Sequence, residues 1–137
     1  MSRYSGWITA LLVTSAAAAA WAMAAITLDR PLAPMVFAVA LAAVWGSGEC
    51  GLRRPLLRGL LALGLCLAGS AYALTFDAAA SLRRALGVPL WDAIGLAGPQ
   101  MLLAIADARL HGAAKAVVGL GQVAAFGLAW VAARRSR

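Results

Sequence analysis

Long apolar runs separated by short polar segments make up most of this sequence. The first run covers residues 7–28 without a charged side chain, and further runs cover residues 32–48, 56–76 and 113–133. A helix of about 20 apolar residues is long enough to cross a hydrocarbon core of roughly 30 Å. The pattern therefore predicts an all-α, polytopic membrane helix bundle with four transmembrane helices, built as one membrane domain over residues 1–137.

A broken segment, residues 88–111, precedes the last run. It is long enough to cross a membrane, but it contains Asp92 and the helix breakers Pro89, Gly98 and Pro99. Because proline fits the first turn of a helix and disrupts its interior, we expect two short helices here. Three arrangements stay open: a kinked additional span, a re-entrant hairpin, or an amphipathic pair lying on the membrane surface.

The composition agrees with a lipid bilayer as the solvent. Apolar residues make up 64% of the chain and charged residues 12%, against roughly 45–50% and about 25% in soluble domains. A soluble domain of 137 residues buries only a limited share of its surface, so it could not hide this much apolar area. We therefore expect an integral membrane protein.

Basic residues gather in short clusters between the apolar runs. The formal net charge is +7, but a nucleic-acid groove needs a continuous basic face with interleaved aromatic residues, so we expect no nucleic-acid partner. If four runs span and the broken segment does not, one side of the membrane carries seven cations: Arg3, Arg53, Arg54, Arg58, Arg134, Arg135 and Arg137. The other side then carries five: Arg30, Arg83, Arg84, Arg109 and Lys115.

This distribution of cations predicts the orientation. Positive residues concentrate on the cytoplasmic side, so four spans with both termini in the cytoplasm are favoured, in the inner membrane of a bacterium. Five spans would divide the cations six and six, and this alternative stays open.

Two stripes of small residues recur at every fourth position of the third and fourth runs. Such stripes let helix backbones approach closely, so we expect them to be packing faces within the bundle or toward partners. The expected partners are the lipid bilayer and either other membrane protein subunits or further copies of this chain. The stripe residues are Ala62, Cys66 and Ser70, and Gly121, Ala125 and Ala129.

Few side chains could carry chemistry. On a continuous helix Asp107 and His111 would lie on one face, four positions apart, and form the closest approach to a catalytic or proton-handling pair. Asp92 is a second catalytic candidate, and it could pair with Lys115 if the broken segment dips into the membrane. Further polar residues that are expected within the membrane or at its surface are Glu49, Gln100 and Gln122.

The residues that redox, metal, nucleotide-binding and hydrolase sites require are missing from the sequence. Cys50 and Cys66 do not form a CxxC pair, and one histidine cannot build a His-rich metal site alone. Walker, GxSxG and HExxH patterns do not occur either. We expect no cofactor and no metal.

Three functions are compatible with so little polar chemistry. The first is a non-catalytic structural or accessory subunit of a larger membrane complex. The alternatives are an oligomeric small-solute or ion transporter or channel, and a small membrane-embedded enzyme using Asp107 and His111 or Asp92. The polar hinge at residues 46–55 could hold Glu49 against its arginines, but these cations are better explained as the cytoplasmic anchor.

Overall fold

A computed structural model describes residues 3–30, 32–110 and 112–136. This part of the chain is all-helical and contains no strand, as the sequence predicted. The elements in chain order are α1 (Arg3–Leu28), the 3-10 turn η1 (Ala33–Met35), α2 (Val36–Glu49), α3 (Pro55–Leu86), α4 (Leu90–Arg109) and α5 (Gly112–Arg135).

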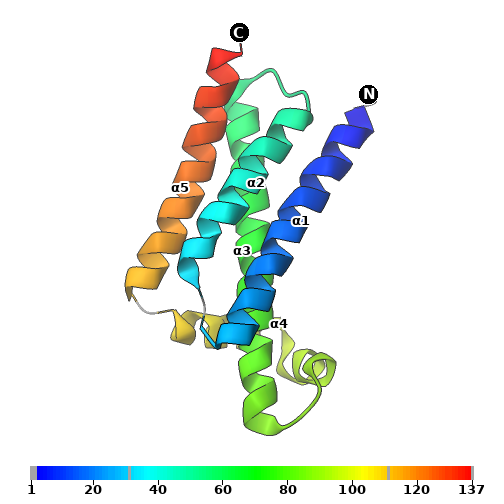
Figure 1. Ribbon diagram of the computed structural model, residues 1–137, viewed down its shortest axis with the longest axis vertical. Coiled ribbons are helices and arrows are strands. Elements are labelled where there is room, and N and C mark those ends of the chain that lie inside the picture. Colours follow the sequence, from blue (N-terminus) through cyan, green and yellow to red (C-terminus); the bar gives the residue numbers. More distant parts are fainter. Residues whose placement is uncertain (1–2, 31, 111, 137) are drawn as a thin grey trace.

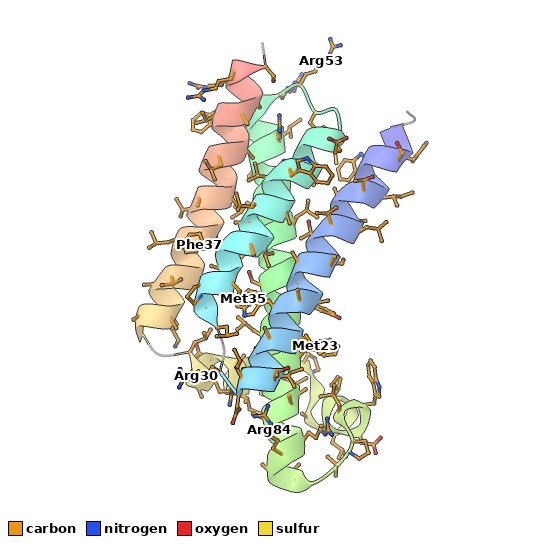
Figure 2. The ribbon with its side chains drawn as sticks, viewed as in Figure 1. Met23, Arg30, Met35, Phe37, Arg53 and Arg84 are labelled. Atoms are coloured by element: carbon orange, nitrogen blue, oxygen red, sulfur yellow. The ribbon has the colours of Figure 1, made fainter. Side chains whose placement is uncertain are left out.

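Helices α1, α2, α3 and α5 lie side by side, whereas α4 lies across one end of the bundle (Figure 1). We call the end with both chain termini and the α2–α3 connection the terminal end, and the opposite end the α4 end. In Figure 2, Arg53 lies at the terminal end, and Arg30 and Arg84 lie at the α4 end. Helix α3 contacts each of the other four helices and is the centre of the structure.

Three of the described helices are long and apolar enough to cross a membrane. They cover Tyr4–Leu28, Pro55–Leu86 and Gly112–Arg135, with mean hydropathy of 1.8, 1.7 and 1.8. The apolar helix over Ala33–Glu49 is shorter. Large apolar side chains such as Leu12, Met23 and Leu120 point outward and are exposed, as expected of a surface facing lipid. This arrangement supports a membrane helix bundle.

Helix α3 continues ten residues beyond its apolar run. Pro55 occupies its first turn, where a missing N–H costs nothing. The helix passes through Asp77 and the alanines that follow, and ends at Gly87, whose φ of 67° and 2.8 Å hydrogen bond to the carbonyl of Arg83 form a left-handed cap. Asp77 does not end the helix because its side chain is buried and paired.

Helix α4 consists of two helical segments joined at a kink. Gly98 has φ 69° and ψ 165°, a conformation outside the helical region, and Pro99 begins the second segment. Gly98 and Pro99 therefore interrupt the helix at the position predicted from the sequence. The second segment ends at Arg109, so the continuous helix needed to place Asp107 and His111 on one face does not form. His111 itself lies outside the described residues.

The core of the bundle is built from small side chains around Trp21, Val36 and Val39. Two glycines bring α2 into close contact with α3 and α5. A Cβ atom added to Gly121 would lie 2.6 Å from Val36 Cγ1, and one added to Gly69 would lie 2.7 Å from Val39 Cγ1. Helix α2 therefore sits against α3 and α5 at a separation that only a missing side chain permits.

Candidate functional site

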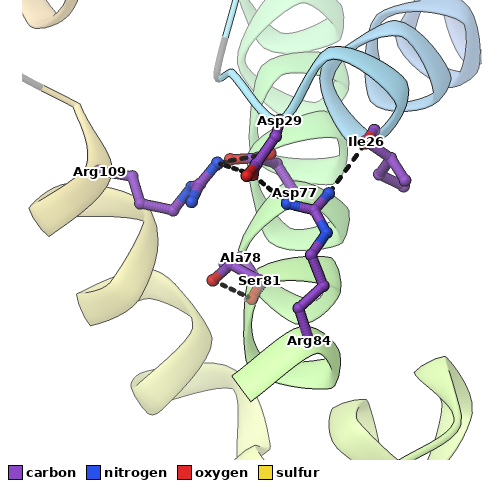
Figure 3. Close-up of polar contacts among 7 residues, drawn as sticks. All are labelled: Ile26, Asp29, Asp77, Ala78, Ser81, Arg84 and Arg109. Carbon is purple, nitrogen blue, oxygen red and sulfur yellow. Dashed lines mark hydrogen bonds and ion pairs between the residues drawn. The ribbon is translucent and has the colours of Figure 1, made fainter. Parts of the chain in front are cut away.

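The buried carboxylate of Asp77 forms a two-point ion pair with Arg109. Asp77 lies on the packed face of α3 and is only 2% exposed. Arg109, at the end of α4, donates from Nε to Oδ2 at 2.8 Å and from Nη2 to Oδ1 at 3.3 Å (Figure 3). This fork geometry is the strongest that arginine and a carboxylate form. The pair joins the second segment of α4 to α3.

Asp29 extends this pair to the end of α1. It directly follows α1 and accepts hydrogen bonds from Arg84 of α3 and, at 3.4 Å, from Arg109 Nη2. Arg84 Nη2 also donates to the carbonyl of Ile26 at 2.8 Å (Figure 3). We call Asp29, Asp77, Arg84 and Arg109 the ion-pair network. It ties three elements together at the α4 end.

The ion-pair network combines two arginines with two aspartates. The hydrogen bond from Arg84 holds the pKa of the Asp29 carboxyl below its ordinary value, against a smaller opposing effect of burial. Burial is the largest single effect on the pKa of Arg109 and lowers it, but the hydrogen bonds and charges of Asp77 and Asp29 together outweigh burial and raise the pKa. Two cations thus face two carboxylates. These groups are suited to holding helices together rather than to exchanging protons.

The ion-pair network lies at the level where the apolar run of α1 ends. Ile26 lies two residues before the end of the apolar run of α1. Because Arg84 hydrogen-bonds the Ile26 carbonyl, its guanidinium lies where that run ends. A helix that crosses the bilayer meets the headgroups at this point.

A second polar contact lies inside the bundle. Gln122 of α5 donates from Nε2 to Ser70 Oγ of α3 at 3.0 Å, and both side chains are buried. Gln122 Oε1 has no hydrogen-bond partner among the described residues. Such interhelical hydrogen bonds are modest in membranes, about 0.6 kcal/mol on average. The contact orients α5 against α3.

The polar residues singled out from the sequence are scattered. Glu49 is exposed at the end of α2, and Gln100 is exposed on α4. The proposed pairing of Asp92 with Lys115 does not form, because Lys115 Nζ lies 2.8 Å from Asp107 Oδ1. The kink in α4 explains this: Asp92 is on its first segment, whereas Asp107 is on the second, close to the start of α5. Asp92 is exposed.

The two stripes of small residues lie on packed faces. On α3, Ala62 and Cys66 are 0% exposed and Ser70 is 4% exposed. On α5, Gly121, Ala125 and Ala129 are all buried, with Gly121 against Val36 as described above.

Sequence reasoning missed the ion-pair network. Asp77 directly follows the apolar run of residues 56–76, and this position gives no sign that its side chain is buried. The signal that could have found it is the spacing of Asp77 and Arg84, seven positions apart on one helical face, with alanines between them. Arg109 carries no comparable signal, since its partner lies on another helix.

A groove opens sideways between α1 and α3, in the middle of both helices. It has a volume of about 440 Å³. Thr14 is 4% exposed, and its Oγ1 has no hydrogen-bond partner among the described residues. We call this the lateral groove; it is lined by Leu11, Thr14, Ser15, Ala18, Leu65, Ala68, Gly69 and Tyr72.

Neither a metal site nor similarity to known proteins indicates a function. In the part of the chain that the structure describes, no three His, Cys, Asp or Glu side chains gather in a group that could hold a metal ion. The chain matches no protein-family model, and no curated protein and no solved structure matches it. A function has to be argued from the residues themselves.

Proposed function

We propose that this protein is a non-catalytic structural or accessory subunit of a larger membrane complex. The observation that carries the proposal is the lateral groove, a concave surface at mid-membrane depth with small residues at its base. The occupant we infer is a transmembrane helix of another subunit.

The chemistry of the lateral groove fits a helix. Its base is formed by Ala18, Ala68 and Gly69, which let a second backbone approach closely. Leu11 and Tyr72 belong to its lining and offer apolar contact area.

The polar groups argue against catalysis by this chain alone. The buried carboxylate is held in a two-point ion pair, and Gln122 is bonded to Ser70. The other four acids are exposed, and two of them are paired, Asp29 with Arg84 and Asp107 with Lys115. Groups fixed in this way support a role in holding helices together.

We also propose four crossings, made by α1, α2, α3 and α5, with α4 at the membrane surface. The layout of the helices supports this, since the α2–α3 connection and both termini share one end. Helix α2 with its preceding turn covers 17 residues, about 26 Å at 1.5 Å per residue. A modest local thinning of the bilayer would let it cross.

Charge supports both termini being cytoplasmic, in a bacterial inner membrane. At the terminal end, the described cations outnumber a single acid, Glu49: they are Arg53, Arg54, Arg58, Arg134 and Arg135. The α4 end is close to neutral. Its cations are Arg30, Arg83, Arg84, Arg109 and Lys115, and its acids are Asp29, Asp77, Asp92 and Asp107. The positive-inside rule counts cations rather than net charge, and over the full sequence seven cations belong to the terminal end and five to the α4 end, which favours the terminal end facing the cytoplasm.

The subunit proposal is tested by filling the lateral groove. Ala68 lines it and is exposed, so Ala68→Leu blocks the groove without disturbing the core. Ala71→Leu is the matched control, because Ala71 is exposed on the same helix and outside the lining. The full chain is purified from its native membrane in mild detergent and its mass is read by native mass spectrometry. We expect a heteromeric complex that A68L loses and A71L keeps.

Two results would contradict the proposal. One is a complex that survives A68L as well as A71L, which places the contact elsewhere. The other is a homo-oligomer that moves a solute or protons when the purified chain is reconstituted in liposomes, which favours a transporter or channel.

The crossing number is tested by labelling single cysteines with a membrane-impermeant thiol reagent in intact cells. Cys50 and Cys66 are first replaced by alanine, and a cysteine is then placed at Gly51 or at Gly87. Both glycines lie in connections with open space around them, and because each has a φ of 67° the two cysteine variants are first checked for normal folding. Four crossings predict labelling at Gly87 only; labelling of both positions, or of Gly51 only, would overturn this topology.

A further inference from the structure

An open basin lies at the α4 end, beside the ion-pair network. It is formed by the end of α1, the last turns of α3 and the connection to α4, and its volume is about 640 Å³. We call it the basic basin, and its lining residues are Ile26, Ala80, Arg83, Arg84, Gly87, Val88 and Pro89. Two adjacent arginines therefore share one concave surface with mainly apolar neighbours.

Arg83 contributes an uncompensated positive charge. It is exposed, and its guanidinium has no ion-pair or hydrogen-bond partner among the described residues. Arg84 is turned toward Asp29 and the carbonyl of Ile26, but a guanidinium has five N–H groups, so donors remain on its other edge. Asp29 is itself shared with Arg109. The local balance is thus one cation in excess.

Other acids do not cancel this charge. The carboxylate of Asp77 is engaged by Arg109, on the packed face of α3. Asp92 lies on the first segment of α4, where it lines a separate shallow cavity with Trp91 and Gly95. The basin therefore offers donors to an anion without a carboxylate in its lining.

The depth of the basin fits a lipid phosphate. Arg84 and the Ile26 carbonyl lie where the apolar run of α1 ends, which is the level of the headgroups in a membrane-spanning helix. The guanidinium of an arginine is well suited to a phosphate, which it binds at two points. Ile26, Ala80 and Val88 in the lining suit the glycerol and the first methylene groups of a lipid.

We propose that the basic basin binds a phosphate group, and that the membrane supplies it as the headgroup of an anionic phospholipid. Arg83 makes the principal contact, and Arg84 a second one from the edge of the ion-pair network. The volume is within the usual range of roughly 300–1,000 Å³ for small-molecule sites.

The test measures lipid retention by the full chain. Phosphatidylglycerol or phosphatidylcholine is titrated into the detergent-solubilised protein, and bound lipid is counted by native mass spectrometry. We expect tighter binding of phosphatidylglycerol, and about a tenfold weaker binding of it to Arg83→Gln, which loses charged hydrogen bonds to the phosphate. Arg83 is exposed and outside the network, so this variant should fold normally.

Arg54→Gln is the matched control, because Arg54 is an exposed arginine at the terminal end. It removes the same charge from the chain, and we expect it to leave the affinity for phosphatidylglycerol unchanged. Equal losses of affinity for phosphatidylglycerol in R83Q and R54Q would show that net charge alone causes the effect. That result would overturn the proposed site. Equal binding of the two lipids by the unmodified protein would also overturn it.

A soluble competitor distinguishes the two sources of phosphate. Excess glycerol phosphate should leave the bound phosphatidylglycerol in place, since it lacks the acyl chains that lie along the bundle. Its displacement of the lipid in the unmodified protein would overturn the assignment to a lipid headgroup, and the occupant would be a soluble phosphate compound.

Discussion

Arg109 reaches from the end of α4 to Asp77 on the packed face of α3, with its Nε 2.8 Å from Oδ2 and its Nη2 3.3 Å from Oδ1. Taking two charges out of water is costly, so such a pair adds less net stability than its geometry suggests. Removing one partner is different, because the other charge then stays buried without compensation. The main role of the pair is therefore to fix the position at which α4 packs against α3.

Replacing Asp77 by asparagine should destabilise the fold by about 3 kcal/mol, because Arg109 loses its buried carboxylate. Reversible unfolding in mixed micelles measures this loss. The double variant Asp77→Asn with Arg109→Gln should cost less than the sum of the single variants, since no uncompensated charge remains. Additive losses would show that the two residues act independently.

Acid should weaken the contact between α1 and α3 through Asp29. The folded-state pKa of this carboxyl is lowered from its model-peptide value of 3.8, chiefly by the hydrogen bond from Arg84. Its contribution is therefore complete above about pH 4 and is lost as the pH falls through the lower folded-state pKa. Unfolding midpoints of the unmodified protein and Asp29→Asn should differ above about pH 4 and converge as the pH falls through the folded-state pKa. Equal midpoints at neutral pH would contradict this contribution.

Gly121→Ala should force α2 and α5 apart, because the new Cβ would lie 2.6 Å from Val36 Cγ1 and 2.7 Å from Cγ2. We expect a loss of about 1–3 kcal/mol. Gly119→Ala is the matched control on the same helix, since nothing lies within 4 Å of its added Cβ, and it should be neutral or slightly stabilising. Adding Val36→Ala to G121A should recover part of the loss. No difference between the two glycine variants would contradict the close approach.

Gly98→Ala should strain the kink of α4, because φ 69° with ψ 165° is a conformation that only glycine adopts easily. The expected cost is about 1–3 kcal/mol. Gly95→Ala, three positions earlier and with open space around it, should leave stability unchanged or raise it slightly. Hydrogen exchange of α4 amides reports the effect locally; equal exchange in both variants would contradict a strained Gly98.

Ser70→Ala should remove the partner of Gln122 Nε2 and cost about 0.6 kcal/mol, the average for hydrogen bonds between membrane helices. The same unfolding assay measures it, and the loss should be clearly smaller than that of D77N. A larger loss in S70A would make the inner contact, rather than the ion pair, the dominant polar interaction of α3.

The helical fold could be predicted from the sequence because each apolar run carries its own signal of length and hydropathy. The kink at Gly98 and Pro99 was also visible, since backbone conformation there depends on the residues themselves. The long extension of α3 was not. A charged residue after an apolar run usually marks the surface, and only its burial against α4 keeps Asp77 in the helix.

The polar contacts depended on partners that no local pattern reveals. Asp107 seemed to belong with His111, four positions away, but α4 ends at Arg109 and the carboxylate meets Lys115 at the start of α5. Arg109 meets Asp77 and Asp29 across 32 and 80 positions of sequence. Such pairs depend on how whole helices pack against one another. A single sequence therefore predicts the helices but not the ion pairs between them.

The separation of Asp77 from Arg109 has a consequence for synthesis in the cell. A chain made from its N-terminus presents the carboxylate of α3 to the membrane 32 residues before the arginine that neutralises it. Until α4 emerges, Asp77 is an unpaired acid at the end of an apolar run, where a hydrated, loosely inserted α3 is favoured. Arrival of Arg109 then locks the helix in place. A chain cut short before this residue would lack the cation that pairs with Asp77, whereas the contact of Gln122 with Ser70 forms only once α5 is made.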